Sequence, residues 1–417
     1  TLSQTDHRCI QTMKNILVFL MPYAGHFFTN VALIRYLASK GINLMIYGDS
    51  RFACLLPAGN IAWRDYPEKI AEYCQNGHTF QHDRNRAAYD YFSYMTDSRK
   101  ILLKEQIDSD MEEILLRAIS REISEFCPDI ILYDAHACFT AAVRKSMPCP
   151  QIEINSSVYA PDIWRSESFK GFYREILRPS YPGDTSYEQI VSISRKREKN
   201  AKSNNLSFAY ISPALQDEPD KISKTHEFIG FYTDIPKSEK REGIYVSRGT
   251  VSESYGAFLL YDTLVALRAF PEHITVSCGG SSCISAVLKE NSFADNNMDI
   301  LSYTDQKKIL SVSKIFITHG GITGVREAIY AHTPMVMIPA NFPDYQTALA
   351  VEKNHGGIMA RRRPVSKDEL QECCHHILNN YDEYTEGLKK MERDLKETWL
   401  MHGPAAVERK CEGLCGD

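Results

Sequence analysis

The chain has 417 residues, a length that predicts two or three domains of about 100–200 residues each. Hydrophobic residues make up 43% of it and charged residues 24%, which excludes a disordered or fibrous protein. The formal net charge of −5 argues against a basic surface for bulk nucleic-acid binding.

Neither the apolar segments nor the cysteines indicate export or membrane insertion. The longest early apolar run, residues 16–21, is too short to span a bilayer and precedes no signal-peptide cleavage pattern. The 12 cysteines form no disulfide framework, which favours reduced thiols and a cytoplasmic protein. A metal site in the Cys-Cys-His-His tract at residues 373–376 is disfavoured, because four consecutive side chains of a helix point in different directions. Residues 1–12 carry no pattern, and we expect them to matter little to the fold.

The chain begins with a strand–helix–strand pattern. Apolar residues 16–20 predict a strand that is buried on both faces. A turn over residues 21–26, a helix over residues 30–40 and a strand over residues 44–47 follow. Units of this kind predict an α/β fold with a parallel sheet. The same order of elements returns at residues 130–133, 139–146 and 151–154.

A charged segment at residues 233–242 separates this region from a second α/β pattern. The chain therefore holds two α/β domains of similar type, and its C-terminal end predicts two further helices. The predicted strands of the second domain lie at residues 244–247, 274–277, 300–303, 315–318 and 335–338, and the helices at 258–270, 383–400 and 405–414.

Residues 65–110 and 156–200 are rich in aromatic and charged residues and have weak periodicity, so we interpret them as helical insertions and loops of the first domain. Their aromatic rings suit the wall of a pocket for an apolar molecule, and packing of helices against the sheet is the alternative. The interleaved charges leave polar ligands open. The rings concerned are Tyr89, Tyr91, Phe92, Tyr94, Tyr159, Trp164, Phe169, Phe172 and Tyr173.

Two residues near strand ends of the first domain are candidates for acid–base chemistry. His26 lies six residues past the first strand, and Asp134 ends a later strand. Ligands of open parallel sheets bind at the carboxyl ends of the strands, so both side chains are placed to reach the same rim. A histidine supported by a carboxylate makes a general base. The alternatives are a polar surface histidine at a helix start and an N-capping aspartate.

A glycine-rich turn follows the predicted strand at residues 315–318 and opens a helix. Glycines let the backbone approach a phosphate closely, and the free amides at the start of a helix bind it. His319 would donate to a phosphate oxygen, and Glu327 would accept from sugar hydroxyls. A tight turn without a ligand is the alternative.

At this point the residues resemble a known family. The block THGGITGVREAIYAHTPMVMIP, at residues 318–339, resembles the donor signature of family 1 glycosyltransferases, which have the GT-B fold. The resemblance covers about residues 13–415 and is greatest to the bacterial macrolide-type enzymes. The other matching segments, in the expected order, are Gly25-His26, residues 128–134, Ser247-Arg248-Gly249-Thr250 and Tyr303-Thr304-Asp305-Gln306.

The resemblance implies two Rossmann-like parallel-sheet domains that face each other across a cleft. It assigns residues 13–232 to an acceptor-binding domain and residues 240–395 to a domain that binds a nucleotide sugar. Residues 396–417 would form C-terminal helices that return to the first domain.

The resemblance also implies an inverting, metal-independent hexosyltransferase that needs no cofactor and uses a nucleotide sugar as co-substrate. His26 would take the proton of an acceptor hydroxyl, Asp134 would orient His26, and the transition state would resemble an oxocarbenium ion. His319 and nearby amides would hold the diphosphate, Glu327 the ribose and Tyr303 the base. The implied donor-binding residues are Ser247, Arg248, Gly249, Thr250, Tyr303, Gln306, His319, Gly321, Thr323, Gly324, Val325, Glu327, Asp344 and Gln346.

The sequence departs from the family pattern at the donor site. Tyr303 and Asp305 replace a Trp and a Pro, and Val325 replaces a frequent Ser or Thr. Only one residue separates Asp344 from Gln346, the candidates for binding sugar hydroxyls, and Asp344 is the better one. UDP-glucose is the expected donor, and a dTDP-deoxysugar, which offers fewer hydroxyls, is the alternative.

The expected acceptor is a hydroxyl of a small natural product, as in antibiotic glycosylation, and we expect a monomer or homodimer without nucleic-acid or integral-membrane partners. A catalytically degenerate GT-B partner or activator protein is one alternative, favoured by the altered donor motifs. A nucleotide-sugar epimerase or hydrolase is another. The presence of His26, Asp134, His319 and Glu327 favours the transferase.

Overall fold

The fold is given by a computed structural model. It describes residues 13–76, 98–159, 166–178, 186–188, 205–247, 249, 260, 263–268, 270–279, 288, 297–339, 341–362 and 365–416.

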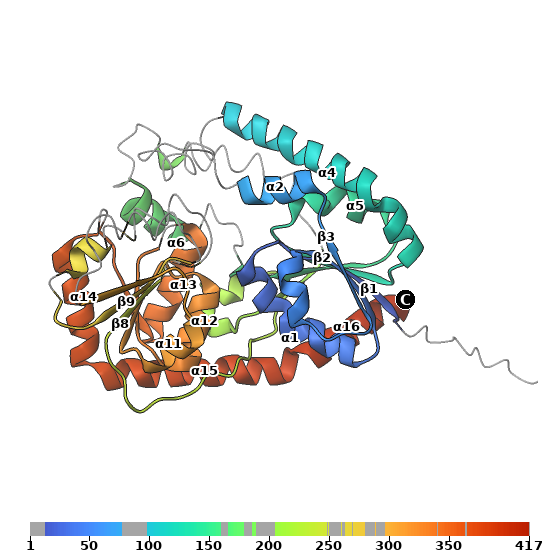
Figure 1. The fold of residues 1–417 in the computed structure, drawn as a ribbon. Helices are drawn as coiled ribbons and strands as arrows, with labels where there is room; N and C mark the ends of the chain where they lie inside the picture. Colours follow the sequence, from blue (N-terminus) through green and yellow to red (C-terminus); the bar gives the residue numbers. More distant parts are fainter. Residues whose placement is uncertain are drawn as a thin grey trace, which may run out of the picture.

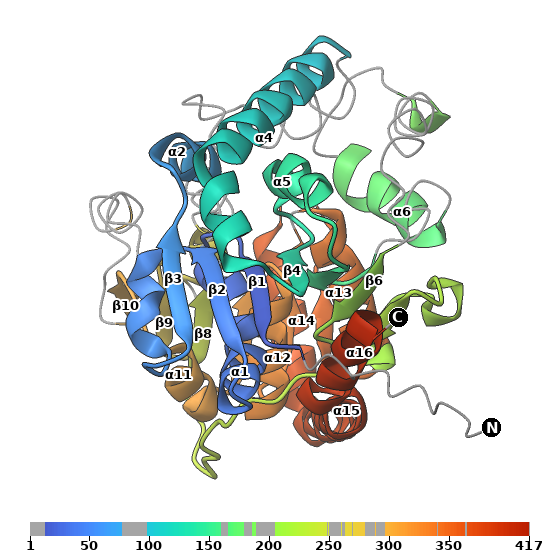
Figure 2. The ribbon, with the colours of Figure 1, turned by 90° about the vertical axis from the view of Figure 1, so that its right-hand side faces the viewer.

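The first domain is built on seven parallel strands in the order β3-β2-β1-β4-β5-β6-β7 (Figures 1 and 2). The central strands β1 and β4 are apolar and almost wholly buried, as expected for a sheet covered on both faces. The strands are β1 (Asn15–Phe19), β2 (Asn43–Gly48), β3 (Ile61–Asp65), β4 (Ile130–Asp134), β5 (Gln151–Asn155), β6 (Leu206–Ala209) and β7 (His226–Phe228). The helices are α1 (Ala24–Ser39), α2 (Glu68–Asn76), α4 (Ser98–Phe126), α5 (Ala141–Ser146) and α6 (Glu167–Phe172).

The second domain holds six parallel strands in the order β10-β9-β8-β11-β12-β13. Its strands are β8 (Ile244–Ser247), β9 (Ile274–Ser277), β10 (Met298–Leu301), β11 (Ile315–Thr318), β12 (Met335–Met337) and β13 (Gly357–Met359). Its helices, and those that follow, are α11 (Gln306–Val312), α12 (Ile322–Ala331), α13 (Phe342–Lys353), α14 (Lys367–Asn379), α15 (Tyr381–His402) and α16 (Pro404–Gly416).

The C-terminal helices link the two sheets. Helix α15 runs along the base of the molecule from the second domain towards the first, and α16 ends beneath the first sheet (Figure 1). The Tyr36 hydroxyl of α1 donates to Glu408 of α16 at 2.8 Å, and Val407 and Cys411 are fully buried there. The first sheet therefore receives part of its covering layer from the end of the chain.

Two differences between the predicted and the observed elements change where candidate site residues lie. The predicted turn at residues 21–26 is wrong in its second half, because α1 already begins at Ala24 and His26 lies in its first turn. The strand predicted at residues 300–303 ends at Leu301, which leaves Tyr303 in the loop before α11. Within the helix predicted at residues 258–270, the structure describes residues 260, 263–268 and 270, and residues 263–267 are helical as predicted.

The aromatic clusters of the insertions are described only in part. Phe169 and Phe172 of α6 are buried, and their rings lie 5.1 and 5.7 Å from the ring of Phe342 on α13. These two rings therefore pack against a helix of the second domain, a contact that neither the predicted pocket wall nor packing against the sheet describes. Tyr89, Tyr91, Phe92, Tyr94 and Trp164 lie outside the described residues.

Two features bear on the expectations about compartment and metal. Among the described residues, no helix is long and apolar enough to cross a bilayer. Residues 373–376 lie on α14, where Cys373 and Cys374 are buried in the core and His375 and His376 are exposed. The four side chains therefore point to different surroundings.

Candidate active site

The candidate residues gather at the places where the strand order of each sheet reverses. In the first sheet, β1 lies beside both β2 and β4, and in the second β8 lies beside both β9 and β11. Open α/β sheets bind ligands outside the carboxyl ends of the strands at such switch points. His26 follows β1 and Asp134 ends β4, while Ser247 ends β8 and His319 follows β11.

His26 and Asp134 form a hydrogen-bonded pair. The His26 Nδ1 atom lies 2.6 Å from Oδ2 of Asp134. The carboxylate is completely buried, whereas 18% of the imidazole is exposed. A bond at Nδ1 leaves Nε2 as the nitrogen available to a substrate, which is the arrangement of a general base supported by a carboxylate.

The carboxylate of Asp134 also holds a second imidazole, which the sequence analysis missed. The main-chain amide of His136 donates to Oδ1 at 2.9 Å, and its Nδ1 lies 3.3 Å from the same oxygen. The rings of His26 and His136 lie edge to face, 5.2 Å apart. Ser156 donates to Oδ2 at 3.3 Å. Position 136 was open to prediction, because a residue two places after a strand-end aspartate folds back onto it in an Asx turn.

These contacts set the charge state of the cluster. Burial by itself raises the pKa of Asp134, but the charges and hydrogen bonds of His26 and His136 outweigh it and hold that pKa below its ordinary value. Burial lowers the pKa of His136, and its bond to Asp134 reverses the effect and raises that pKa overall. Asp134 is therefore an anion at neutral pH, as the support of a base requires.

The same three side chains are also the only described group with ligand atoms close enough to hold a metal ion, all within 4.8 Å. Both imidazole Nδ1 atoms already face a carboxylate oxygen at hydrogen-bond distance. The Nδ1 atoms that an ion would need are therefore engaged in these hydrogen bonds.

On the second sheet the strand ends share one turn type. A Ser or Thr ends each of three adjacent strands, and its hydroxyl accepts from the amide of the glycine two residues later. These turns shape the rim from backbone rather than from long side chains. The pairs are Ser247 with Gly249 (3.3 Å), Ser277 with Gly279 (3.5 Å) and Thr318 with Gly320 (3.3 Å).

Helix α12 begins at this rim and presents unbonded amides. In the described part of the chain, the amides of Ile322, Thr323 and Gly324 donate to no acceptor. The amide of Val325 already donates to the Gly321 carbonyl at 3.1 Å, so it is not available to a phosphate in this conformation. Of the implied donor-binding residues on this helix, Thr323 and Gly324 therefore have free amides and Val325 does not. Free amides and the dipole at the start of a helix are features that favour an anion.

His319 lies between two glycines. A Cβ atom added to Gly249 would meet Cε1 of His319 at 2.9 Å, and one added to Gly321 would meet Nε2 at 2.3 Å. Gly249 also has a φ of +71°, which side chains rarely allow. Both glycines are therefore required for the imidazole to lie in the turn.

Glu327 and Gln306 form the next part of this surface. Gln306 donates to Glu327 Oε2 at 2.7 Å and accepts from the Tyr245 hydroxyl at 3.3 Å. Burial raises the pKa of Glu327, and the bond from Gln306 opposes that shift. The second carboxylate oxygen is available to a partner such as a sugar hydroxyl.

The remaining residues differ in how well their positions agree with the donor-binding roles that the family resemblance implies. Tyr303 is 67% exposed and free to stack on a flat ring. Asp344 lies beside the glycine turn, since a Cβ added to Gly320 would meet its carbonyl at 3.1 Å. Residues two apart on a helix face different sides, so Gln346 cannot share a surface with Asp344 on α13. Arg248 and Thr250 lie outside the described residues.

The two strand-end sites meet across the domain contact. A Cβ atom added to Gly25, the neighbour of His26, would lie 3.6 Å from the Thr323 hydroxyl oxygen of α12. The turn that carries the imidazole therefore lies directly against the turn that carries the free amides.

The comparisons with known proteins agree with this geometry. Residues 257–398 match the glycosyltransferase family 28 C-terminal domain. The glycosyltransferase of kitacinnamycin has a similar structure, with a TM-score of 0.64, 18% sequence identity and coverage of 96% of this chain and 100% of that chain. CalG4, the calicheamicin glycosyltransferase, has a TM-score of 0.62 at 17% identity and covers 97% of this chain and 98% of that one. The chain has the GT-B fold.

Curated glycosyltransferase sequences are also similar to this chain. The uncharacterized UDP-glucosyltransferase YojK of Bacillus subtilis is 21% identical over 404 residues, covering 92% of this chain and 94% of the relative. The NDP-glycosyltransferase YjiC of the same species is 21% identical over 400 residues, covering 90% and 92%. The predicted family resemblance and fold class are thus confirmed, and the coarse functional prediction of a glycosyltransferase is supported.

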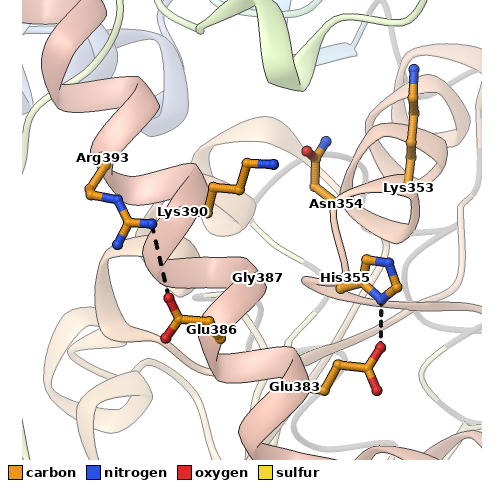
Figure 3. A pocket seen from close by; sticks show the side chains of 8 residues that line it. All are labelled: Lys353, Asn354, His355, Glu383, Glu386, Gly387, Lys390 and Arg393. Atoms are coloured by element: carbon orange, nitrogen blue, oxygen red, sulfur yellow. Dashed lines mark ion pairs between the residues drawn. The ribbon is translucent and has the colours of Figure 1, made fainter.

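A surface hollow lies elsewhere on this GT-B chain. It measures about 590 Å³ and is lined by charged residues where α13 ends and along α15 (Figure 3). His355 and Glu383 pair there at 2.8 Å, and Glu386 pairs with Arg393 at 3.9 Å. His355 precedes β13, so the hollow lies towards the amino ends of the strands, away from both switch points.

Proposed function

We propose that the protein is an inverting, metal-independent glycosyltransferase that moves a sugar from a nucleotide sugar to a hydroxyl of a small natural product. One observation carries the proposal: the turn of α1 that carries the supported imidazole of His26 lies against the turn of α12 that presents free amides. A base and an anion site in contact are the two parts that a single displacement at a sugar carbon requires.

In this reaction the acceptor hydroxyl gives its proton to Nε2 of His26 while its oxygen attacks the anomeric carbon. The imidazolium that forms is stabilised by the buried carboxylate of Asp134, whose other oxygen is held by His136. The diphosphate leaves from the opposite face of the sugar. Attack and departure on opposite faces invert the configuration at the anomeric carbon.

The leaving diphosphate gains negative charge as the bond breaks. The free amides of Ile322, Thr323 and Gly324, the dipole of α12 and His319 would stabilise that charge. These fixed donors need no reorganisation during the reaction. They provide the stabilisation that a divalent ion supplies in other phosphate sites, which supports metal independence.

The donor class follows from the groups beside the diphosphate turn. Glu327 would accept from ribose hydroxyls, Tyr303 would stack on the base, and Asp344 would contact the sugar. A UDP-hexose, with UDP-glucose first, matches the names of the curated relatives, and a dTDP-deoxysugar matches the loss of a clean pair at Asp344 and Gln346. For the acceptor, the similar antibiotic glycosyltransferases favour a hydroxyl of a small natural product.

The test begins with thermal melts in UDP, dTDP, GDP and ADP. A bound nucleotide at about 100 times its Kd should stabilise the fold by roughly 2.7 kcal/mol. The stabilising nucleotide then selects the sugars offered with a panel of natural-product hydroxyls, and the product's anomeric configuration is read by NMR. We expect inversion, and rates unchanged by EDTA.

Other outcomes would favour the alternatives. Absence of stabilisation by all four nucleotides would favour a degenerate partner protein, and the search would turn to binding proteins. Conversion of the free nucleotide sugar without any acceptor would favour the epimerase or hydrolase. A product that keeps the donor's anomeric configuration would overturn the single displacement.

A further inference from the structure

One buried charge at the domain contact has no role in the mechanism so far. Arg326 lies on α12 directly before Glu327 and has no exposed surface. No carboxylate of the described residues lies within ion-pair distance of its guanidinium, and its Nε finds no acceptor among them. Burial lowers the pKa of Arg326 to about 10, so the side chain is still a cation at neutral pH. The charge of the neighbouring Glu327 opposes the effect of burial on that pKa, but among the described residues no carboxylate forms an ion pair with Arg326. Burying a charge without such a pair is costly, which indicates that Arg326 has a function.

The guanidinium joins both domains through neutral oxygens. Its Nη1 donates to the carbonyl of Tyr210, which follows β6, at 2.8 Å. Its Nη2 donates to the hydroxyl of Thr29 on α1 at 2.7 Å and lies 3.4 Å from the hydroxyl of Thr323. The ring of Phe231 lies 4.0 Å from Cζ. The flat fork of arginine, unlike the single ammonium of lysine, fits several acceptors at once.

The partners of Arg326 in the first domain are connected by hydrogen bonds to the turn of α1 that carries His26. Thr29 donates its own proton to the Gly25 carbonyl at 2.7 Å. The Tyr210 hydroxyl donates to Asn30 at 2.8 Å, and Asn30 donates to the His26 carbonyl at 2.8 Å. Both paths therefore end on the first turn of α1, at the main chain that carries the imidazole.

The contact with Thr323 connects Arg326 to the turn of α12 that is proposed to bind the diphosphate. Thr323 belongs to the first turn of α12, where three amides are free to bind an anion. Since Arg326 also belongs to α12, its charge lies one helical turn behind those amides. Arg326 thus contacts residues that hold the turn of His26 and also a residue of the turn with the free amides.

We propose that Arg326 is a positioning residue that fixes the turn of His26 relative to the diphosphate-binding turn of α12, with a charge that the bound diphosphate balances. This inference rests on the proposed glycosyltransferase function. It assigns two separable effects to one side chain. The forked guanidinium fixes the distance between the two turns and so affects kcat. Its charge strengthens donor binding and so affects the donor KM.

Two substitutions separate these effects. Arg326→Lys keeps the charge and loses the fork, so kcat should fall about 10-fold or more with the donor KM within about threefold, because misplaced reacting groups lose rate. Arg326→Met loses both, so kcat should fall similarly and the donor KM should also rise about 10-fold. Equal effects of both substitutions on KM would overturn the assignment of the charge.

Arg241 provides a matched control. It is a half-buried arginine that, like Arg326, binds neutral oxygens, with its Nη1 donating to Thr333 at 2.9 Å and to the Ser313 carbonyl at 3.1 Å. These partners lie within the second domain and away from the switch points. Arg241→Met should lower the melting temperature and leave kcat and the donor KM within twofold of the wild type.

Amide hydrogen exchange tests the positioning without any activity. In Arg326→Lys, exchange should quicken at residues 24–30 and 325–329 together, and in Arg241→Met at neither segment. Unchanged exchange at residues 24–30 would overturn the proposal, whatever the kinetics show. Should the wild type bind no nucleotide and transfer no sugar, the proposed function fails, and the exchange data alone decide whether Arg326 joins the two turns.

Discussion

The two switch points differ in the kind of group that they present, side chains on the first sheet and mostly backbone on the second. At the carboxyl ends of β1 and β4, the working groups are side chains, with a buried aspartate that holds two imidazoles. At the ends of β8 and β11, the working groups are mostly backbone, with glycine turns and the free amides of α12. A base must change its protonation state and needs a titratable side chain, whereas a departing diphosphate needs fixed donors.

This difference predicts how each side responds to substitution. Changes of side chain should be most damaging on the first sheet, where a single group would perform the proposed proton transfer. On the second sheet the backbone donors survive most side-chain changes, so damage should come chiefly from residues that disturb the backbone or block its surface.

The largest effect is expected for Asp134→Asn. The amide cannot stabilise the imidazolium of His26, and its NH2 group would face the Nδ1 proton, so kcat should fall about 10³- to 10⁴-fold. Stabilisation by the preferred nucleotide should be unchanged, because Asp134 lies on the first sheet. Initial rates and thermal melts measure both quantities. A loss of transfer below tenfold would contradict the prediction that side-chain changes are most damaging on the first sheet.

The next effect is expected for Gly249→Ala, with Gly41→Ala as its matched control. Both glycines have positive φ, +71° and +79°, so each substitution should cost about 1–2 kcal/mol of stability. Only the alanine at 249 would press on His319, because nothing lies within 4 Å of a Cβ at Gly41. We expect about 10²-fold lower kcat/KM for the first variant alone, as for loss of one oxyanion donor. Equal kinetic effects would remove His319 from the donor site.

Glu327→Ala should act on binding rather than on rate. Loss of a hydrogen bond from a charged group costs about 1.5–3 kcal/mol, so the donor KM should rise about 10-fold or more with little change in kcat. The effect should be larger for a UDP sugar than for a dTDP sugar, because deoxyribose lacks the 2′-hydroxyl. Donor titrations with both nucleotides measure the contrast, and an unchanged KM would exclude Glu327 from the ribose site.

The smallest effect is expected for His136→Gln, and it depends on pH. The native pKa of His136 is raised above the unfolded value near 6.5, so its stabilising effect is complete below that pH and is lost as pH rises through the native pKa. The side chain is half exposed, so solvent screens the contribution. The difference in melting temperature between wild type and variant should therefore shrink between about pH 5.5 and 8.5. A difference that stays constant would contradict the pairing with Asp134.

The sequence analysis was most successful where local patterns determine structure. The apolar run of β4 ends at Asp134, and the glycine turn opens α12 as predicted. The start of α1 was misplaced because Tyr23, its N-cap, is not a capping residue type and makes no side-chain cap bond. Aromatic density could not separate a pocket wall from packing at Phe169, because both uses need the same rings.

Contacts between distant residues were beyond the sequence analysis. Arg326 meets Thr29 across 297 positions and Tyr210 across 116, so no local pattern distinguishes it from a solvent-exposed helix arginine. The contact between Gly25 and Thr323 is of the same kind. These contacts decide whether the two halves of the site act together.

The most direct test of the central claim is the rate of sugar transfer by His26→Ala, with stabilisation by the preferred nucleotide as the internal control. The account predicts a loss of transfer of at least about 10³-fold, while the nucleotide stabilises this variant as much as the wild type. Full transfer by the variant would contradict the assignment of His26 as the base and with it the mechanism proposed for this fold.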